Sequence, residues 1–186
     1  MKRSRKILIV CHCLLNANAK IYPLALTGGV YREVLETYFR EGTGIVQLPC
    51  PELSYLGANR WGMTREQYDH PNFRSHCKKI LKHPVNQIKT LHQANYDIRG
   101  ILGVDGSPNC GVNLTCEGFT GGEMCSQSDI ASQIQGLKYI QGQGIFMEIL
   151  ADMLQSRHIS GEFLAVSEKN HLDHNNDNQP KKGNEK

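Results

Sequence analysis

The sequence contains no long apolar run. Across its 186 residues, no stretch approaches the roughly 20 consecutive apolar residues that a membrane-spanning helix needs. The basic residues near the start are followed by only four strongly apolar residues and then by Cys-His-Cys, too short for the apolar region of a signal peptide. We therefore expect a cytoplasmic protein whose function involves no membrane.

The sequence also lacks a strong excess of positive or negative charge. The chain has 21 Lys and Arg against 18 Asp and Glu, so its formal net charge is only +3. One basic cluster precedes the first expected strand and resembles a solvated chain end more than a phosphate-binding arm. This charge pattern predicts no nucleic acid partner. The cluster consists of Lys2, Arg3, Arg5 and Lys6.

The seven cysteines lack the two close pairs of a zinc ribbon. Without an export signal they are expected in a reducing compartment, where cysteines serve as ligands, catalysts or packing residues more often than as disulfides. Three of them each follow an apolar, strand-like run instead. Cys13 comes after residues 6–10, Cys50 after residues 45–49 and Cys110 after residues 98–104.

Apolar strand patterns alternate with helical patterns along the chain. This alternation is typical of an open, mostly parallel sheet covered by helices, that is, an α/β domain. We expect one domain over residues 1–167 and a disordered polar tail over residues 168–186. The expected strands are 7–10, 44–48, 98–104 and 163–166; the expected helices are 30–39, 64–70, 73–81, 85–91 and 146–154, with irregular segments at 51–63 and 112–136.

The carboxyl ends of neighbouring parallel strands open onto one crevice, so the three thiols are expected to converge. Three soft ligands suit a metal or iron–sulfur centre with one open position, which is the design of a catalytic site. Cys11 can either face this site or be a buried strand residue. Cys116 and Cys125 follow Cys110 in an irregular region, and a fourth ligand from either would close the centre.

Three short motifs of the chain resemble the signatures of the thiouracil desulfidase family. They occur in the family's order, and the similarity, which includes Gly142–Phe146, covers roughly residues 6–167. The resemblance implies a compact, Rossmann-like, three-layer α/β domain with its site at the carboxyl ends of the strands. The motifs are Cys13-Leu14-Leu15-Asn16, Cys50-Pro51-Glu52 and Gly106-Ser107-Pro108-Asn109-Cys110-Gly111.

The same resemblance implies a cofactor and site residues. A [4Fe-4S] cluster would be held by Cys13, Cys50 and Cys110, leaving the fourth iron free to bind the sulfur of a thiolated base. Glu52 and Ser107 would be the acid–base pair. Residues 17–22 and 53–64 depart from the family's usual sequence and are expected to wall the substrate pocket.

The chemistry of the residues agrees with this expectation. A thiocarbonyl sulfur is soft and suits a soft-ligated iron, which would polarise the C=S bond. Glu52 could take a proton from the attacking water, and Ser107 could protonate or orient the substrate. Sulfide would then leave without net redox change. The expected activity is hydrolytic desulfuration of a small thiocarbonyl compound or a thiolated, thiouracil-like heterocycle.

Two other hypotheses stay open. The chain could be a non-catalytic metal-binding or sulfur-handling protein with zinc or a fully ligated cluster. It could also be a small-molecule binding domain whose cysteines only pack. Asp105 is expected to form a turn rather than act as a second catalytic carboxylate. No sequence feature indicates an oligomeric state.

Overall fold

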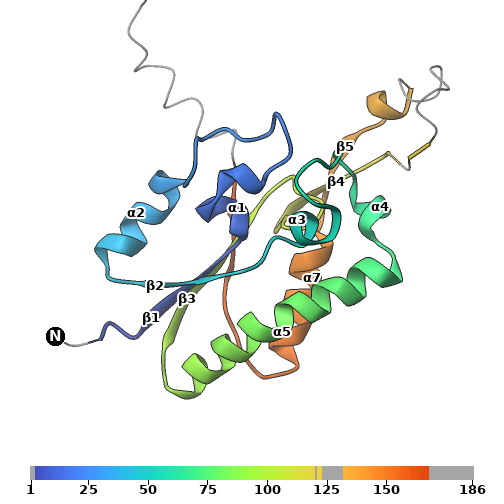
Figure 1. The fold of residues 1–186 in the computed structure, drawn as a ribbon. Coiled ribbons are helices and arrows are strands. Elements are labelled where there is room, and N and C mark those ends of the chain that lie inside the picture. The colour runs from blue at the N-terminus through green and yellow to red at the C-terminus, as the bar shows by residue number, and fades with distance from the viewer. Residues whose placement is uncertain (1–2, 120, 123–131, 168–186) are drawn as a thin grey trace, which may run out of the picture.

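The structure is a computed structural model of the chain, and it describes residues 3–119, 121–122 and 132–167 (Figure 1). The expected tail over 168–186 and Cys125 lie outside these residues. None of the helices in the described ranges combines the length and apolar character that a membrane crossing requires.

The core of the fold is a four-stranded sheet in which every neighbouring pair of strands is parallel. Its strand order is β2-β1-β3-β6, and a separate antiparallel pair is formed by β4 and β5. This confirms the expected Rossmann-like α/β fold. The strands are β1 (Lys6–Val10), β2 (Gly44–Gln47), β3 (Asp97–Val104), β4 (Leu114–Glu117), β5 (Lys138–Gln141) and β6 (Phe163–Val166).

Helices cover both faces of the sheet (Figure 1). Alternate residues of β1 point to opposite faces, as in any strand. Leu8 belongs to the core cluster that includes Leu35 of α2, whereas Ile9 belongs to the cluster under α5 and α7. The domain therefore has three layers. The longer helices are α2 (Arg32–Arg40), α5 (Pro71–Gln93) and α7 (Ile145–Gln155); the short ones are α1 (His12–Leu15), η1 (Ala17–Ala19), α3 (Pro51–Leu56) and α4 (Arg65–Tyr68).

Two predicted helices are in fact one. The sequence predicts separate helices over 73–81 and 85–91, but α5 runs from Pro71 to Gln93 and continues through Pro84. A proline inside a helix loses one backbone hydrogen bond and crowds the preceding turn. Here Leu81, Val85 and Ile88 are fully buried around Pro84. The burial of these side chains offsets the free-energy cost of the lost hydrogen bond and the crowding at Pro84. Tertiary contacts supply most of the stability of a helix in a protein.

Two segments expected to be irregular contain regular structure. Residues 51–63 begin with α3, in which Pro51 occupies the first turn, a position where proline needs no hydrogen-bond partner. Cys50 caps this helix, since its Sγ accepts a hydrogen bond from the Leu53 N–H at 3.4 Å. Residues 112–136 contain β4, which pairs with β5. The other expected strands and helices are confirmed, with shifts of a few residues at their ends.

Gly144 gives a test of how α7 is attached to the sheet. It lies just before α7, where a Cβ would come within 2.4 Å of the Asn109 carbonyl carbon. We expect Gly144→Ala to lower the free energy of unfolding by about 1–3 kcal/mol, because backbone must move. A Cβ on Gly28 has no neighbour within 4 Å. Equal urea-unfolding curves for Gly144→Ala and the control Gly28→Ala would contradict this account.

Candidate thiol-rich site at the carboxyl edge of the sheet

The topology brings three cysteines to one edge of the sheet. Cys11 follows β1, Cys50 follows β2 and Cys110 lies in the turn after β3. Strand β1 lies between the other two, and the chain crosses to β2 on one side before it enters β3 on the other. Such a switch of direction leaves a crevice at the carboxyl ends of the strands, where ligands bind in open α/β sheets.

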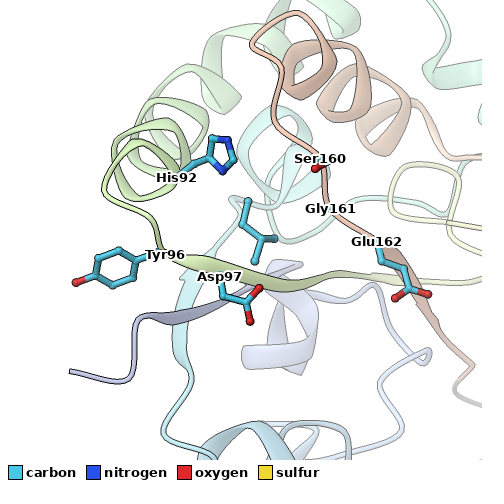
Figure 2. Close-up of a pocket in the computed structure, with 7 residues that line it drawn as sticks. His92, Tyr96, Asp97, Ser160, Gly161 and Glu162 are labelled. Atoms are coloured by element: carbon cyan, nitrogen blue, oxygen red, sulfur yellow. The ribbon is translucent and has the colours of Figure 1, made fainter. Parts of the chain in front are cut away.

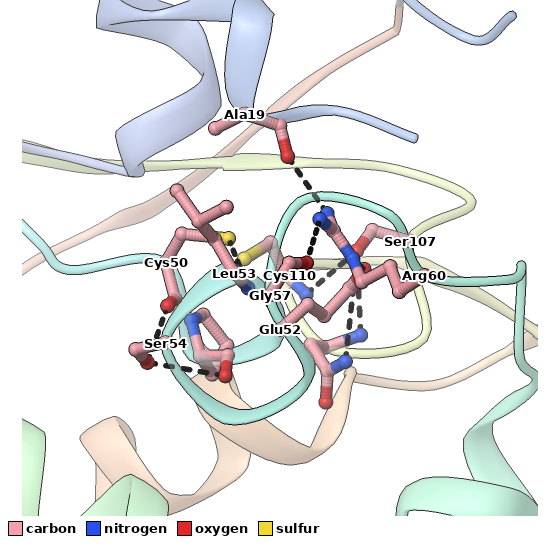
Figure 3. A network of polar contacts seen from close by, with 11 residues as sticks. Ala19, Cys50, Glu52, Leu53, Ser54, Gly57, Arg60, Ser107 and Cys110 are labelled. Carbon is pink, nitrogen blue, oxygen red and sulfur yellow. Dashed lines mark hydrogen bonds and ion pairs between the residues drawn. The ribbon is translucent and has the colours of Figure 1, made fainter. Parts of the chain in front are cut away.

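The thiols interact with one another across this edge. The Cys11 and Cys110 side chains lie close enough to shift each other's pKa, and Cys13 and Cys50 also act on the pKa of Cys11. Cys50 is in turn affected by Cys110, and Figure 3 shows both side chains in one polar network. Cys50 and Cys110 therefore lie in one neighbourhood with Cys11, and Cys13 is linked to this group through Cys11. None of the six described cysteines forms a disulfide.

Cys11 combines the two roles that the sequence left open. It is fully buried and belongs to the core cluster under α5 and α7, as Ile7 and Ile9 do. Its thiol also faces Cys110. A fourth sulfur thus lies beside Cys110. Cys116, the other candidate within the described residues, lies in β4.

The thiols of Cys11, Cys50 and Cys110 have raised pKa values, so they are protonated at neutral pH. Burial raises the pKa of Cys50 to about 11. The hydrogen bond with Cys11, and then burial, raise the pKa of Cys110. The hydrogen bond with Cys110 lowers the pKa of Cys11, but burial and the charges of the neighbouring thiols outweigh it. Because metals bind thiolates, any metal that enters this site must displace protons.

Among the described residues, the donor side chains do not form a ready-made site for a metal ion. Within the described ranges, no three His, Cys, Asp or Glu side chains are grouped as a metal ion requires. In a cluster each thiolate binds a different iron, so its ligands need not converge on one point. The cysteines at this edge offer only soft sulfur, which suits iron–sulfur chemistry and not hard cations such as Mg²⁺.

Glu52 lies beside the thiols and is held by two partners. It occupies the first turn of α3. Its Oε1 accepts a hydrogen bond from Asn109 Nδ2 at 3.0 Å, and its Oε2 pairs with Arg60 Nε at 3.2 Å (Figure 3). These two bonds fix the orientation of the carboxylate. The Glu52 charge also acts on both Cys50 and Cys110.

The Arg60 side chain is almost fully enclosed, with 4% of its surface exposed against 16% for Glu52. It also donates to the carbonyl oxygens of Gly57 at 3.1 Å and Ala19 at 2.7 Å. One guanidinium thus joins η1, the loop after α3 and the candidate acid–base residue. Arginine suits this role because its planar group offers several donors in fixed directions.

Ser107 shapes the turn that carries Cys110. Its Oγ accepts hydrogen bonds from the N–H groups of Cys110 at 2.9 Å and Asn109 at 3.3 Å. Its hydroxyl also lowers the pKa of Cys110, opposing the effect of burial. The structure therefore places Ser107 beside a predicted ligand while giving it the turn-forming role that the motif also suggested.

Asp105 has the structural role expected from the sequence. Its Oδ1 accepts hydrogen bonds from three successive N–H groups at 2.8–3.2 Å. This oxygen therefore closes the turn after β3. The three donors are Val112, Asn113 and Leu114.

Sequence reasoning missed three residues around Glu52. Asn109 lies inside a recognised motif but reads there as a turn residue. Arg60 lies in a segment that was expected only to wall a pocket. No sequence pattern pointed to Tyr68, although the charges of Glu52 and Arg60 affect the pKa of its hydroxyl. Their roles depend on contacts between distant parts of the chain.

A second hollow lies at the opposite edge of the sheet. It has a volume of about 470 Å³ and sits where α5 ends and β3 begins (Figure 2). It shares no residue with the thiol-rich site. Its lining residues are His92, Tyr96, Asp97, Ile98, Ser160, Gly161 and Glu162.

The fold and site define a Rossmann-like α/β domain with a cluster of thiols at its topological switch point. The chain belongs to the same family as the uncharacterized protein MJ0003 of Methanocaldococcus jannaschii. The two are 36% identical over 110 residues, which are 59% of this chain and 70% of the relative. No family profile matches the chain. No solved structure matches it either.

The buried ion pair can be tested by a double-mutant cycle. Removing one partner of a buried pair leaves an uncompensated charge, so we expect Arg60→Gln to lower the free energy of unfolding by about 3 kcal/mol. The double variant with Glu52→Gln should recover part of this loss. Urea unfolding at pH 7 measures all four proteins. Strictly additive effects would show that the pair is not coupled.

The protonation of Cys50 can be tested by alkylation of the metal-free protein. Only the thiolate reacts, so a pKa of about 11 predicts that the rate at Cys50 rises about tenfold per pH unit from pH 7 to 9.5. A small free thiol should level off above about pH 8.5. Mass spectrometry after iodoacetamide treatment resolves the site, and a plateau at Cys50 below pH 9 would contradict the prediction.

Proposed function

We propose that the protein is a [4Fe-4S]-dependent desulfidase. Its reaction would be the hydrolytic, non-redox removal of sulfur from a small thiocarbonyl compound or a thiolated, thiouracil-like heterocycle. The observation that carries this proposal is the meeting of Cys50, Cys110 and the oriented carboxylate of Glu52 at the carboxyl edge of the sheet. The resemblance of the three motifs to the thiouracil desulfidase family supports it.

Cys13, Cys50 and Cys110 are the residues that would hold the cluster. When bound, the cluster supplies a soft Lewis acid that polarises a C=S bond. Cys13 lies in α1, one turn from the end of β1, and packs against both core clusters. The three thiols come from three separate segments, so each can serve a different iron.

Glu52 is the proposed general base. A carboxylate held by Arg60 and Asn109 keeps its orientation while it accepts a proton from the attacking water. Ser107 is the proposed second proton-handling residue, since its hydroxyl lies beside Cys110. It would orient the substrate or return a proton to it. These groups provide the proton movements that hydrolysis of a C=S bond needs.

The proposed setting is the cytoplasm, because a site whose described cysteines form no disulfide suits a reducing compartment. The proposed partner is a small thiolated molecule, with no role for nucleic acid. We assign the described elements to a single domain within residues 1–167.

One observation favours a second candidate function. Cys11 places a fourth thiol beside Cys110, and a fourth ligand would close the coordination of a cluster or a Zn²⁺ ion. The protein would then bind metal or handle sulfur without turnover. The two candidates differ in whether one iron is open and whether Glu52 is required.

Metal analysis after anaerobic reconstitution distinguishes the candidates. We expect about four irons and four sulfides per chain, with one iron distinct from three cysteine-bound irons in the Mössbauer spectrum. Serine variants of Cys13, Cys50 and Cys110 should each lose iron, whereas the helix α5 control Cys77→Ala should keep it. Zinc, four equivalent irons or no metal would overturn the desulfidase proposal.

The role of Glu52 has its own test. Glu52→Gln removes the proton acceptor but keeps the shape of the side chain, so sulfide release should fall by about 100-fold or more. The absorption spectrum of the reconstituted cluster should not change. Glu36→Gln, on the exposed surface of α2, is the matched control and should retain full activity. Full activity in Glu52→Gln would refute the proposed base.

A further inference from the structure

Two loops that meet beside Glu52 carry the two most exposed large apolar side chains of the described residues. Tyr22 has 96% of its surface exposed and Trp61 has 75%. Tyr22 belongs to the loop after η1, and Trp61 to the loop after α3. Three leucines in or next to these loops are 39–53% exposed. We call these five side chains the apolar rim: Tyr22, Leu24, Leu26, Leu56 and Trp61.

The two loops touch each other at the residues next to Tyr22 and Trp61. A Cβ on Gly62 would lie only 3.0 Å from Ile21 Cδ1, so the loops are in van der Waals contact there. Tyr22 follows Ile21 in the chain, and Trp61 precedes Gly62. Single exposed apolar residues are common on protein surfaces, whereas grouped ones mark binding sites. Here the two largest exposures flank one contact.

Arg60 connects the apolar rim to the proposed base. Its Nη2 donates to the Ala19 carbonyl oxygen at 2.7 Å, and its Nε pairs with Glu52 Oε2 at 3.2 Å (Figure 3). Arg60 directly precedes Trp61, and Ala19 lies three positions before Tyr22. One enclosed side chain therefore ties both loops to the carboxylate, so the rim is continuous with the candidate site.

The two segments that carry the rim have almost no charge. Over residues 17–30 and 53–63 the only charged residues are Lys20 and Arg60. The Arg60 side chain is enclosed and ion-paired, and Lys20 lies over the Tyr31 ring, with its Nζ 5.8 Å from the ring centroid. Nucleic acids and anionic membranes are bound through clustered Lys and Arg. The charge of these segments therefore fits a neutral, apolar occupant.

We propose that the apolar rim binds the part of the substrate that does not react. The preferred substrate is then a thiolated heterocycle that carries a neutral, apolar substituent, not the bare ring. Tyr and Trp offer flat apolar surfaces on which such a group can stack. Binding energy gained away from the reacting atoms helps to hold the C=S group in position. This inference rests on the proposed function and names its substrate class.

The fluorescence of Trp61 gives a direct test, because Trp61 is the only tryptophan of the chain. We expect 1-benzyluracil, which has no sulfur to release, to shift the emission of the reconstituted full-length protein to shorter wavelength and to protect it from acrylamide quenching. Both effects should saturate, and uracil at the same concentrations should cause neither.

Two variants show whether the rim is responsible. Tyr22→Ala should weaken the binding of 1-benzyluracil by about fivefold or more, because it removes apolar contact area. Phe39→Ala is the matched control and should bind like the wild type. Phe39 is 46% exposed, but it lies near the end of α2, which leads to the amino end of β2.

Sulfide release gives the second measurement. The kcat/KM for 1-benzyl-4-thiouracil should exceed that for 4-thiouracil by about tenfold or more, since burial of an aromatic group contributes at least that factor. Trp61→Ala should reduce this ratio to below about twofold, whereas Phe39→Ala should keep it.

The outcomes separate this inference from the proposed function. No fluorescence response to 1-benzyluracil, with equal kcat/KM for the two thiouracils, would overturn the inference and leave the desulfidase proposal standing. An emission shift caused by protein concentration alone, or by phosphatidylcholine vesicles but not by 1-benzyluracil, would also overturn it, since the rim would then contact a second copy of the chain or a membrane. Saturable binding of 1-benzyluracil to a protein that releases no sulfide from any thiolated substrate would support the apolar binding surface and overturn the proposed function.

Discussion

The parallel pairing of β1 with both β2 and β3 is the constraint on which the site depends. Val10 is in register with Gln47 on one side and Leu102 on the other. The ladder continues one residue further, because Cys11 N–H donates to the Leu102 carbonyl at 3.1 Å. The three strands therefore end together, and the segments that follow them must share one edge. Hydrophobic burial on both faces of the sheet fixes this register.

Local turn chemistry then sets how each segment leaves that edge. The Cys50 thiol caps α3, and this places Glu52 in the first turn of the helix. Ser107 and Asp105 satisfy the backbone N–H groups around Cys110. The N–H groups that begin α7 donate to the Asn109 carbonyl, so the helix supports the same turn. Residues that look like ordinary turn formers thus position the thiols and the carboxylate.

Sequence patterns predicted what depends on near neighbours. The four sheet strands, α2 and α7 follow from periodicity, and the meeting of the segments that carry Cys50 and Cys110 follows from their places after parallel strands. The continuous α5 did not, because the burial that outweighs Pro84 is a tertiary effect. Arg60 meets Ala19 across 41 positions and Glu52 meets Asn109 across 57. No local pattern encodes contacts of that kind, so the surroundings of Glu52 could not be predicted.

The polar groups around Glu52 argue against a purely packing role for the cysteines. A buried ion pair contributes little net stability, because desolvation offsets much of its attraction, and apolar residues of similar volume would often stabilise the fold as well. Stability alone therefore gives no reason to keep an oriented carboxylate and a buried guanidinium beside neutral thiols. The proposed site, which would bind a polar reactant and move its proton, does.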